Sequence, residues 1–212
     1  MSEMKNIVVL DYGLGNVRSV SNALSAVGAN PQVSRNETNI LQADGLLIPG
    51  VGAFPHAMER LVEAGLGEQI RRFIDSGRPV LGICLGMQLL FEQGTEFALT
   101  KGLGVIAGTV DRIPIRPDEG RLPHIAWSRV RATKHGSDKL FAGLCEDELR
   151  FYFVHSYAAI GVPVEHVMGT AEYLGQEIVA VVQCGNVWGT QFHPEKSGPS
   201  GLRLLKNFIS YC

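Results

Sequence analysis

The sequence predicts an α/β fold in which a doubly wound, mostly parallel sheet is flanked by helices and extended by antiparallel strands. In the first half of the chain, short continuous apolar runs alternate with amphipathic segments of helical period, and short loops join them. This alternation is typical of right-handed strand–helix–strand units. Beyond Gly94 the segments become short and β-prone, and several of the gaps carry glycine. Such segments indicate antiparallel hairpins at one side of the sheet.

The composition is that of an ordinary globular protein, and we expect a single domain over residues 1–212. The formal net charge of -2 gives no reason to expect a nucleic acid or an anionic membrane as partner. No apolar run reaches transmembrane length and no export signal is visible, so we expect a cytoplasmic protein. The cysteines are too scattered for a metal site, so we expect reduced thiols, no metal and no cofactor: Cys84, Cys145, Cys184 and Cys212.

The first strand, over 6–10, is continuously apolar, as expected for a parallel strand buried on both faces. A glycine-rich loop follows it, and Asn16 can cap a helix over about 17–27. The next expected elements continue the alternation: strands at 31–34 and 45–48, then helices at about 53–63 and 66–76.

A nucleophile elbow of the form G-x-C-x-G is predicted around Cys84. The apolar run at 80–81 reaches a corner of small residues, and the chain is expected to resume as a helix over 87–91. Gly82 and Gly86 fit this corner because a tight turn leaves no room for a Cβ atom. The sulfur would then lie at a helix N-terminus, where unpaired N–H groups favour an anion. The alternative is a buried cysteine in a glycine-flanked strand.

The second half contains the β-prone segments and a closing helix. Residues 102–107 fit the letters G-x-G-x-x-A, but the following residues look like a strand, so we reject a dinucleotide site. In the closing helix we expect Leu202, Leu205 and Ile209 on one face. The expected elements of this half are strands at 149–157, 167–173, 177–183 and 187–191, and a helix at 200–210.

His193 is the preferred base for a cysteine nucleophile among the six histidines. It follows an apolar strand, so it should lie at a strand end, where the loops of open parallel sheets converge on ligands. Glu195 can fold back and accept the Nδ1 proton, which leaves Nε2 for the sulfur. Taken alone, this segment could be a surface loop with a charge pair. We expect His56, His135 and His166 at the surface, and His124 is left without a role.

Acyl transfer also needs hydrogen-bond donors for a developing oxyanion. The backbone N–H of Leu85, directly after the cysteine, supplies one. The second is expected from the loop at 49–52, where Gly50 and Gly52 would let the peptide at Val51 turn an N–H into the site. The alternative is a plain strand-to-helix turn.

Six segments together resemble the class I (triad) glutamine amidotransferases: DYGLGN, LIPGVGAF, GICLGMQLLFE, PHIAW, YFVHSY and TQFHPEKS. More narrowly, they resemble the glutaminase subunits of imidazole glycerol phosphate synthases, in histidine biosynthesis. The resemblance runs from about residue 6 to the closing helix. It implies that Cys84 is the nucleophile, His193 the base and acid, and Glu195 the orienting carboxylate. It also implies an oxyanion region around Val51, Gly52 and Leu85, and a glutamine pocket lined by Gln88, Glu96, His155, Ser156 and Tyr157.

The resemblance further implies that the chain hydrolyses glutamine to glutamate and ammonia. The ammonia would pass to a (β/α)8-barrel synthase (cyclase) subunit, which makes imidazole glycerol phosphate and the aminoimidazole carboxamide ribotide by-product. Ala126 and Ser128 depart from the family motif, which has Gly and Asn at these positions. The positions expected near the partner interface are Asn16, Trp127, Tyr152 and Lys196.

Three alternatives remain open from the sequence. The chain could serve another synthase, for aminodeoxychorismate or anthranilate, or act as a stand-alone hydrolase. It could also be a catalytically silent docking protein of the same fold. The intact set of Cys84, His193 and Glu195 argues against the silent protein, which has no physical need for all three.

Overall fold

The computed structural model describes residues 4–116, 118, 120–135 and 140–212. The strands of a large sheet are Asn6–Leu10 (β1), Asn30–Ser34 (β2), Gly45–Ile48 (β3), Val80–Ile83 (β4), His124–Ala132 (β8), Arg150–His155 (β9), Val167–Tyr173 (β11), Gln176–Cys184 (β12) and Val187–Thr190 (β13). A smaller sheet is formed by Phe91–Gly94 (β5), Thr100–Lys101 (β6), Ile106–Arg112 (β7) and Tyr157–Ile160 (β10). The α-helices are Val17–Ala26 (α1), Glu37–Gln42 (α2), Phe54–Glu63 (α3), Leu66–Asp75 (α4), Leu85–Gln88 (α5) and Gly198–Ile209 (α6). Short 3₁₀ helices lie at Glu146–Glu148, Val164–His166 and Pro194–Lys196.

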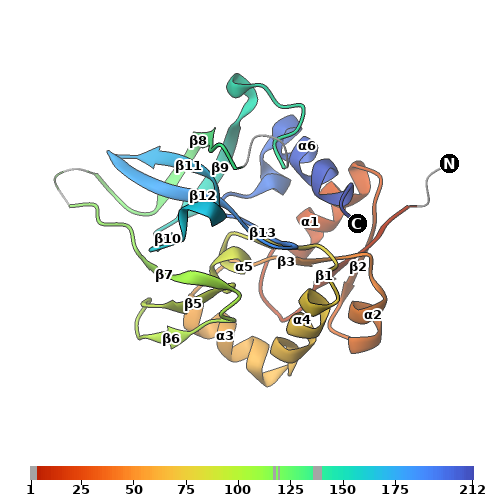
Figure 1. The fold of residues 1–212 in the computed structure, drawn as a ribbon. Helices are drawn as coiled ribbons and strands as arrows, with labels where there is room; N and C mark the ends of the chain where they lie inside the picture. Colours follow the sequence, from red (N-terminus) through yellow and green to blue (C-terminus); the bar gives the residue numbers. More distant parts are fainter. Residues whose placement is uncertain (1–3, 117, 119, 136–139) are drawn as a thin grey trace.

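The large sheet has nine strands in the order β2-β1-β3-β4-β13-β12-β11-β8-β9 (Figure 1). The strands from β2 to β13 are parallel, and those from β13 to β9 are antiparallel. The fold class predicted from the sequence is confirmed, although the antiparallel half of the sheet is as wide as the parallel half. The smaller sheet has the order β10-β7-β5-β6.

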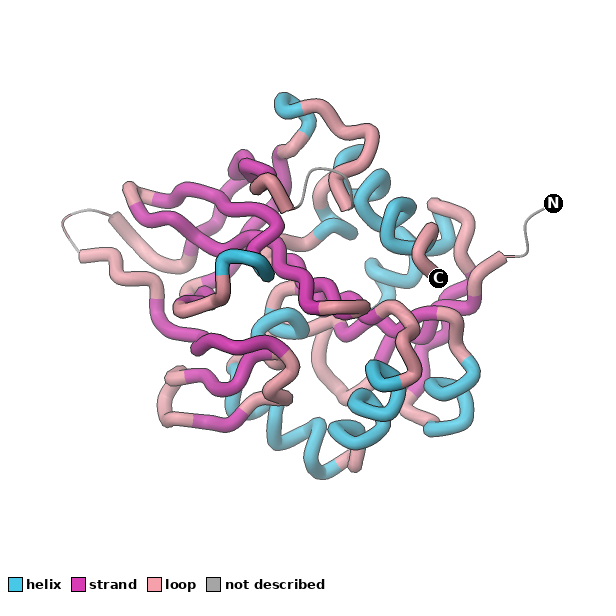
Figure 2. Tube along the Cα trace, in the orientation of Figure 1, coloured by secondary structure: helices cyan, strands magenta, loops and turns pink. Residues whose placement is uncertain are grey.

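Helices cover both faces of the large sheet (Figures 1 and 2). On one face, α1 and α6 bury apolar side chains such as Leu24 and Phe208 against the sheet. On the other, α2, α3 and α4 bury side chains such as Ile40 and Phe73. Asn16 caps α1 as predicted, because its side chain accepts the N–H of Ser19 at 3.2 Å. Within the described part of the chain, no helix combines the length and apolar character needed to cross a membrane.

Three predictions about individual helices and strands were wrong. The helix after the elbow ends at Gln88, and Phe91 starts β5, where pairing beside Ile106 buries its ring completely. The segment at 149–157 breaks at Ser156, so that β9 joins the large sheet and β10 the smaller one. The last strand, β13, was expected in an antiparallel hairpin. It does pair antiparallel with β12, but its other edge pairs in parallel with β4.

Other elements were missed or shifted. The sequence patterns did not indicate α2, whose N-terminus is capped by Asn36, or β8 in the segment after Pro123. In α6 the buried face differs from the predicted one, since Leu202 and Ile209 are only half-buried. The fully buried members of that helix are Gly201, Leu204, Leu205 and Phe208.

Candidate active site

The candidate site lies where three neighbouring parallel strands end. β3, β4 and β13 are adjacent in the sheet, and their carboxyl ends lead into the loop at 49–52, Cys84 and His193 respectively. The N–H of Cys84 donates to the carbonyl of Thr190 at 2.7 Å, which continues the pairing of β4 with β13 up to the elbow. The carboxyl ends of parallel strands are where ligand sites form in such sheets.

The elbow around Cys84 has the conformation that the glycine pattern predicts. Cys84 has φ 54° and ψ -111°, a combination that non-glycine residues rarely adopt and that costs about 1–3 kcal/mol. A Cβ atom on Gly86 would lie 1.9 Å from the carbonyl oxygen of Ile48. The close approach of α5 to the end of β3 therefore requires glycine at this position.

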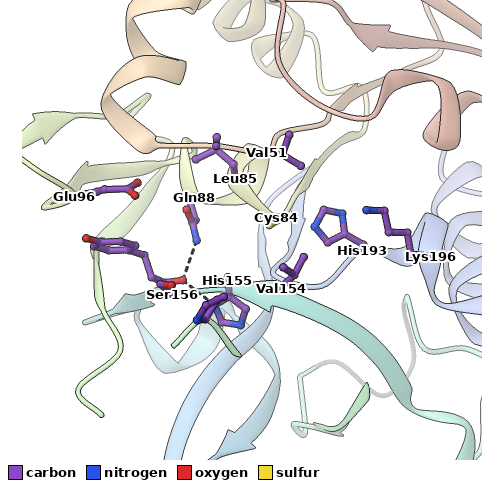
Figure 3. Close-up of a pocket in the computed structure, with 13 residues that line it drawn as sticks. Val51, Cys84, Leu85, Gln88, Glu96, Val154, His155, Ser156, His193 and Lys196 are labelled. Carbon is purple, nitrogen blue, oxygen red and sulfur yellow. Dashed lines mark hydrogen bonds between the residues drawn. The ribbon is translucent and has the colours of Figure 1, made fainter. Parts of the chain in front are cut away.

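A cavity of about 450 Å³ opens at the elbow (Figure 3). In the figure, Cys84 lies between Gln88 and His193, with Glu96 further along the cavity wall. Pro123 and Val154 were not predicted to line it. The lining residues are Val51, Gly52, Cys84, Leu85, Gln88, Glu96, Pro123, Val154, His155, Ser156, Tyr157, His193 and Lys196. The structure thus brings the predicted glutamine-pocket residues together around the cysteine, and their roles remain predictions.

His193 and Glu195 form a buried pair beside Cys84. The Nδ1 atom of His193 and Oε1 of Glu195 are 2.8 Å apart, and the two side chains are 2% and 1% exposed. Burial of the ring lowers the pKa of His193, but the proximity of Cys84 and the hydrogen bond to Glu195 outweigh it and raise the pKa to about 10. The ring is therefore protonated on both nitrogens at neutral pH. Nε2 makes no hydrogen bond of regular geometry with any described residue, so its proton is available beside the sulfur.

The backbone of His193 is held from both sides. Its N–H donates to the carbonyl of Tyr152 at 3.0 Å, and its own carbonyl accepts the hydroxyl of Ser197 at 2.6 Å. The same hydroxyl oxygen accepts the N–H of Tyr152 at 3.0 Å. The position of the imidazole is therefore tied to strand β9.

The loop at 49–52 packs directly on the elbow. A Cβ atom on Gly50 would lie 2.7 Å from the backbone nitrogen of Gly86, so Gly50 lies behind the cavity wall instead of lining it. The buried hydroxyl of Tyr12 donates to the carbonyl of Pro49 at 2.6 Å and fixes the start of the loop. Burial, and then the negative charge of Cys84, raises the pKa of Tyr12, so this hydroxyl remains a donor. Val51 is exposed in the cavity mouth.

Glu96 supplies a carboxylate to the end of the cavity away from His193 (Figure 3). Its Oε2 accepts the N–H of Phe54, at the start of α3, at 2.8 Å. A helix N-terminus stabilises an anion through its unpaired N–H groups and its dipole. A fixed negative charge there suits the α-ammonium group of an amino acid.

The role of His124 was missed from the sequence. It is fully buried, and its ring stacks on Phe153 at 4.9 Å and on Tyr173 at 4.1 Å between centroids. Its Nδ1 lies 3.1 Å from Nε2 of His155, and its Nε2 lies 2.8 Å from the hydroxyl of Ser128. The apolar alternation around His124 could have indicated a strand, but its partner lies 31 residues away and was not visible.

Burial lowers the pKa of His124 to about 4. Burial likewise lowers the pKa of His155 to about 3, despite its hydrogen bond to Tyr157, and electrostatic interactions with His124 and His193 lower it further. Both rings are therefore neutral at neutral pH, in contrast to His193.

Two of the predicted interface residues lie on β8 and β9, and the other two lie near the cavity and the loop at 49–52. Trp127 and Tyr152 are cross-strand partners of β8 and β9, with ring centroids 6.2 Å apart. Trp127 is 54% exposed, and Ile125 on the same face of β8 is 58% exposed. Lys196 lines the cavity, and Asn16 follows Gly15, which packs on Pro49. Their contact with a partner remains a prediction.

The four cysteines are all free thiols. Cys84 is buried at the elbow, Cys145 is exposed, and Cys184 and Cys212 are half-buried. In the described segments, no three His, Cys, Asp or Glu side chains are grouped so that they could bind a metal ion.

Comparison with known proteins identifies the relatives of this chain. Residues 8–211 match the family described as glutamine amidotransferase class-I. The chain is 47% identical to the imidazole glycerol phosphate synthase subunit HisH of Methanosarcina acetivorans over 210 residues, which cover 99% of this chain and 100% of that protein. It is 44% identical to the protein of the same name from Listeria innocua, over 95% of this chain and 94% of that protein.

Solved structures with similar folds are more distant in sequence. A crystal structure described as a glutamine amidotransferase matches with a TM-score of 0.72 and 20% identity, over 96% of this chain and 97% of that chain. The structure of PurLQS from Thermotoga maritima matches with a TM-score of 0.73 and 18% identity, over 99% of both chains. These similarities support the fold assignment alone.

Proposed function

Because this chain belongs to the class I glutamine amidotransferases and, within them, to the HisH subunits of imidazole glycerol phosphate synthase, it is a glutaminase subunit of histidine biosynthesis, and we propose how its site carries out the reaction. Cys84 is the nucleophile, His193 the acid and base, and Glu195 the carboxylate that orients His193. The observation that carries this assignment is the buried 2.8 Å bond between His193 and Glu195, with the other ring nitrogen left free beside Cys84.

In the first half of the reaction, the Sγ atom of Cys84 attacks the side-chain amide carbon of glutamine. Leu85 and the loop around Val51 supply the N–H donors for the oxyanion, and Glu96 receives the α-ammonium group. The tetrahedral intermediate collapses when the C–N bond breaks, and Nε2 of His193 gives its proton to the leaving nitrogen. A pKa of about 10 supports His193 as the acid in this step, since its ring starts protonated.

In the second half, a water molecule hydrolyses the γ-glutamyl thioester. His193 is now neutral, so Nε2 takes a proton from the water while its oxygen attacks the thioester carbon. The C–S bond breaks, Cys84 returns as the thiolate, and His193 is again protonated. Glutamate leaves and its new carboxyl group loses a proton to solvent.

The product ammonia is useful only if it reaches a second active site without being protonated in bulk water. We propose that a (β/α)8-barrel cyclase subunit docks over the cavity mouth and receives the ammonia through a dry passage. The exposed Trp127 and Ile125 beside the cavity support this docking, because exposed apolar side chains grouped on one face are typical of interaction surfaces. A cytoplasmic location is part of the same proposal, and the free thiols support it.

The test is to incubate the purified chain with glutamine, alone and with the barrel subunit of the histidine pathway, and to measure glutamate. We expect release of glutamate to depend on that barrel. Barrel subunits from other glutamine-dependent synthases serve as controls and should leave the rate unchanged. A high rate with the isolated chain would instead indicate a stand-alone hydrolase, and no release under any condition would indicate a silent docking protein.

A further inference from the structure

A chain of hydrogen bonds runs through the protein behind the cavity, from Ser128 on β8 to the sulfur of Cys84. The members between these two ends are all nearly or fully buried side chains, apart from one backbone carbonyl. The links are Ser128 to His124 at 2.8 Å, His124 to His155 at 3.1 Å, His155 to the Tyr157 carbonyl at 2.8 Å, Gln88 to the same carbonyl at 2.9 Å, Gln88 to Gln191 at 3.0 Å and Gln191 to Cys84 at 3.8 Å.

The Tyr157 carbonyl fixes the direction of the bonds on the histidine side. A carbonyl oxygen can only accept, so the proton of the neutral His155 ring must lie on Nδ1. Nε2 of His155 is then an acceptor, and Nδ1 of His124 must carry the proton between the two rings. Nε2 of His124 is in turn an acceptor, so the hydroxyl of Ser128 donates to it. One arrangement of protons satisfies every link.

The same carbonyl fixes the amides on the other side. Gln88 must direct its NH₂ group to the Tyr157 carbonyl, and the second proton of that group points at Gln191. Gln191 must meet it with Oε1, because two NH₂ groups facing each other would leave a buried donor unsatisfied. The NH₂ group of Gln191 therefore faces the sulfur of Cys84.

We infer that Gln191 is a further catalytic residue of the proposed glutaminase reaction, which donates a hydrogen bond to the Cys84 sulfur. His155 and His124 are positioning residues, because they hold the Tyr157 carbonyl that fixes the direction of the two amides. This inference rests on the proposed function. Gln191 is fully buried and does not line the cavity, so it contacts the sulfur from behind and leaves the side facing glutamine free. An N–H directed at sulfur stabilises the thiolate relative to the thiol, because hydrogen bonds to a charged acceptor are stronger.

The arrangement also prepares the substrate side. Gln88 uses both of its protons inside the chain of bonds, and no hydrogen bond of the described residues uses its Oε1. This oxygen is the remaining acceptor of Gln88, which lines the cavity. Gln88 therefore offers the substrate an acceptor only.

The test measures the rate at which iodoacetamide alkylates Cys84 as a function of pH, in the full chain and without partner, by peptide mass spectrometry. Gln191→Met removes the donor with little change in volume. We expect the midpoint of its alkylation profile to move to higher pH by about 1 unit relative to wild type, the size expected for a lost hydrogen bond to a charged group. The other titratable groups around the sulfur are unchanged in this variant: Tyr12, Glu96, His155, Tyr157, His193, Glu195 and Lys196.

A second pair of variants tests the positioning residues. His155→Phe removes the donor to the Tyr157 carbonyl and should move the midpoint in the same direction, whereas His155→Asn can place an N–H near the former Nδ1 and should restore it. If Gln191→Met does not fold, as judged by circular dichroism, Gln191→Glu replaces it and should move the profile upward by at least as much. A wild-type midpoint in a folded Gln191 variant would overturn the inference.

The same experiment tests the proposed nucleophile separately from the role of Gln191. If Cys84 of the wild-type chain is not the cysteine that reacts first, the nucleophile assignment fails. If Cys84 reacts first but its profile is indifferent to Gln191, only the donor assignment fails. A merely structural role for Gln191 would lower thermal stability without moving the midpoint.

Discussion

Three buried histidines near one cavity carry different charges for reasons that the structure makes explicit. His193 has a carboxylate on one side and a cysteine on the other, and these partners raise its pKa to about 10 against the effect of burial. His124 and His155 have no carboxylate partner among the described residues, so burial lowers their pKa values to about 4 and about 3. The partner of each ring, more than its burial, therefore decides its charge.

The neutral pair predicts how folding stability depends on pH. Because the folded pKa values of His124 and His155 lie below the ordinary value of 6.5, the unfolded chain binds more protons below that pH. Their contribution to the free energy of unfolding is present above about pH 6.5. It is lost as the pH falls towards about 4 for His124 and about 3 for His155, by up to about 1.4 kcal/mol per pH unit for each ring. The pH dependence is reversed for His193. Its contribution to the free energy of unfolding is present below about pH 6.5 and is lost as the pH rises towards about 10.

Urea unfolding at several pH values between about 7 and 4 measures this dependence. We expect His124→Phe to be less stable than wild type near neutral pH, and to lose less stability on acidification, by up to about 1.4 kcal/mol per pH unit. His56→Gln changes an exposed histidine and should keep the wild-type slope. Equal slopes in the wild type and His124→Phe would show that His124 is not held neutral.

Replacement of the nucleophile is the most direct test at the residue scale. In Cys84→Ala, glutamate release with the partner should fall by about three to six orders of magnitude, the range seen when a covalent nucleophile is removed. Cys145→Ala changes the exposed cysteine and should leave the rate unchanged. Glutamate release is measured for both variants under the same conditions, and a comparable rate in Cys84→Ala would rule out this nucleophile.

At the scale of elements, the site depends on how closely α5 approaches the end of β3. The loop at 49–52, which we propose as part of the oxyanion hole, follows β3, the proposed nucleophile Cys84 follows β4, and the proposed base His193 lies beyond β13. The order of these strands in the sheet brings the three together. Gly86 and Gly50 let the two backbones touch, because a side chain on either residue would overlap the neighbouring main chain. The elbow and the loop are thus packed as one unit.

Gly86→Ala tests this unit. Its Cβ atom would lie 1.9 Å from the carbonyl oxygen of Ile48, so the backbone must move. We expect a loss of about 1–3 kcal/mol in the free energy of unfolding, the usual cost of overpacking, together with loss of glutaminase activity. Gly67→Ala is the matched control, because a Cβ atom there has its nearest neighbour at 4.0 Å and lies in helix α4. The control should be neutral or slightly stabilising, and equal unfolding midpoints for the two variants would contradict the packing argument.

The elements that the sequence predicted correctly are those whose signals are local. β1, α1, β3, α3 and α4 follow from continuous apolar runs, helical periodicity and an Asn cap, and the placement of Cys84 and His193 at the ends of strands follows from their motifs. The sequence did not show that Phe91 starts a second sheet, because its partner strand begins at Ile106 and only the tertiary pairing separates this outcome from a longer helix.

The network behind the site was missed for a similar reason. His124 and His155 are cross-strand partners in β8 and β9, and neither has a local motif that indicates the other. The same holds for Gln88 and Gln191, which are 103 residues apart in sequence. Motifs therefore indicated Cys84, His193 and Glu195, whereas the hydrogen-bond network behind them became visible only with the sheet order.

At the scale of the whole molecule, a single backbone hydrogen bond connects the strand that carries the exposed aromatic face to the buried pair of His193 and Glu195. Trp127 and Tyr152 lie side by side on β8 and β9, and the backbone of Tyr152 bonds both His193 and Ser197. A partner that covers Trp127 would therefore press on the strand that positions the imidazole. This arrangement gives a physical route by which docking could change the rate of glutamine hydrolysis.

Trp127→Ala tests whether that face receives the partner. Buried aromatic side chains at interface centres often contribute about 2 kcal/mol or more, so we expect the barrel concentration needed for half-maximal glutamate release to rise by about 10-fold or more. The alkylation profile of Cys84 in the isolated chain should stay as in wild type, because the Trp127 side chain is exposed and takes no part in the buried hydrogen bonds. Val62→Ala removes a still more exposed apolar side chain from α3, on the other side of the molecule, and should behave as wild type (Figure 1). If Trp127→Ala and Val62→Ala require the same barrel concentration, the partner docks elsewhere, and the connection from Tyr152 to His193 would not serve to sense it.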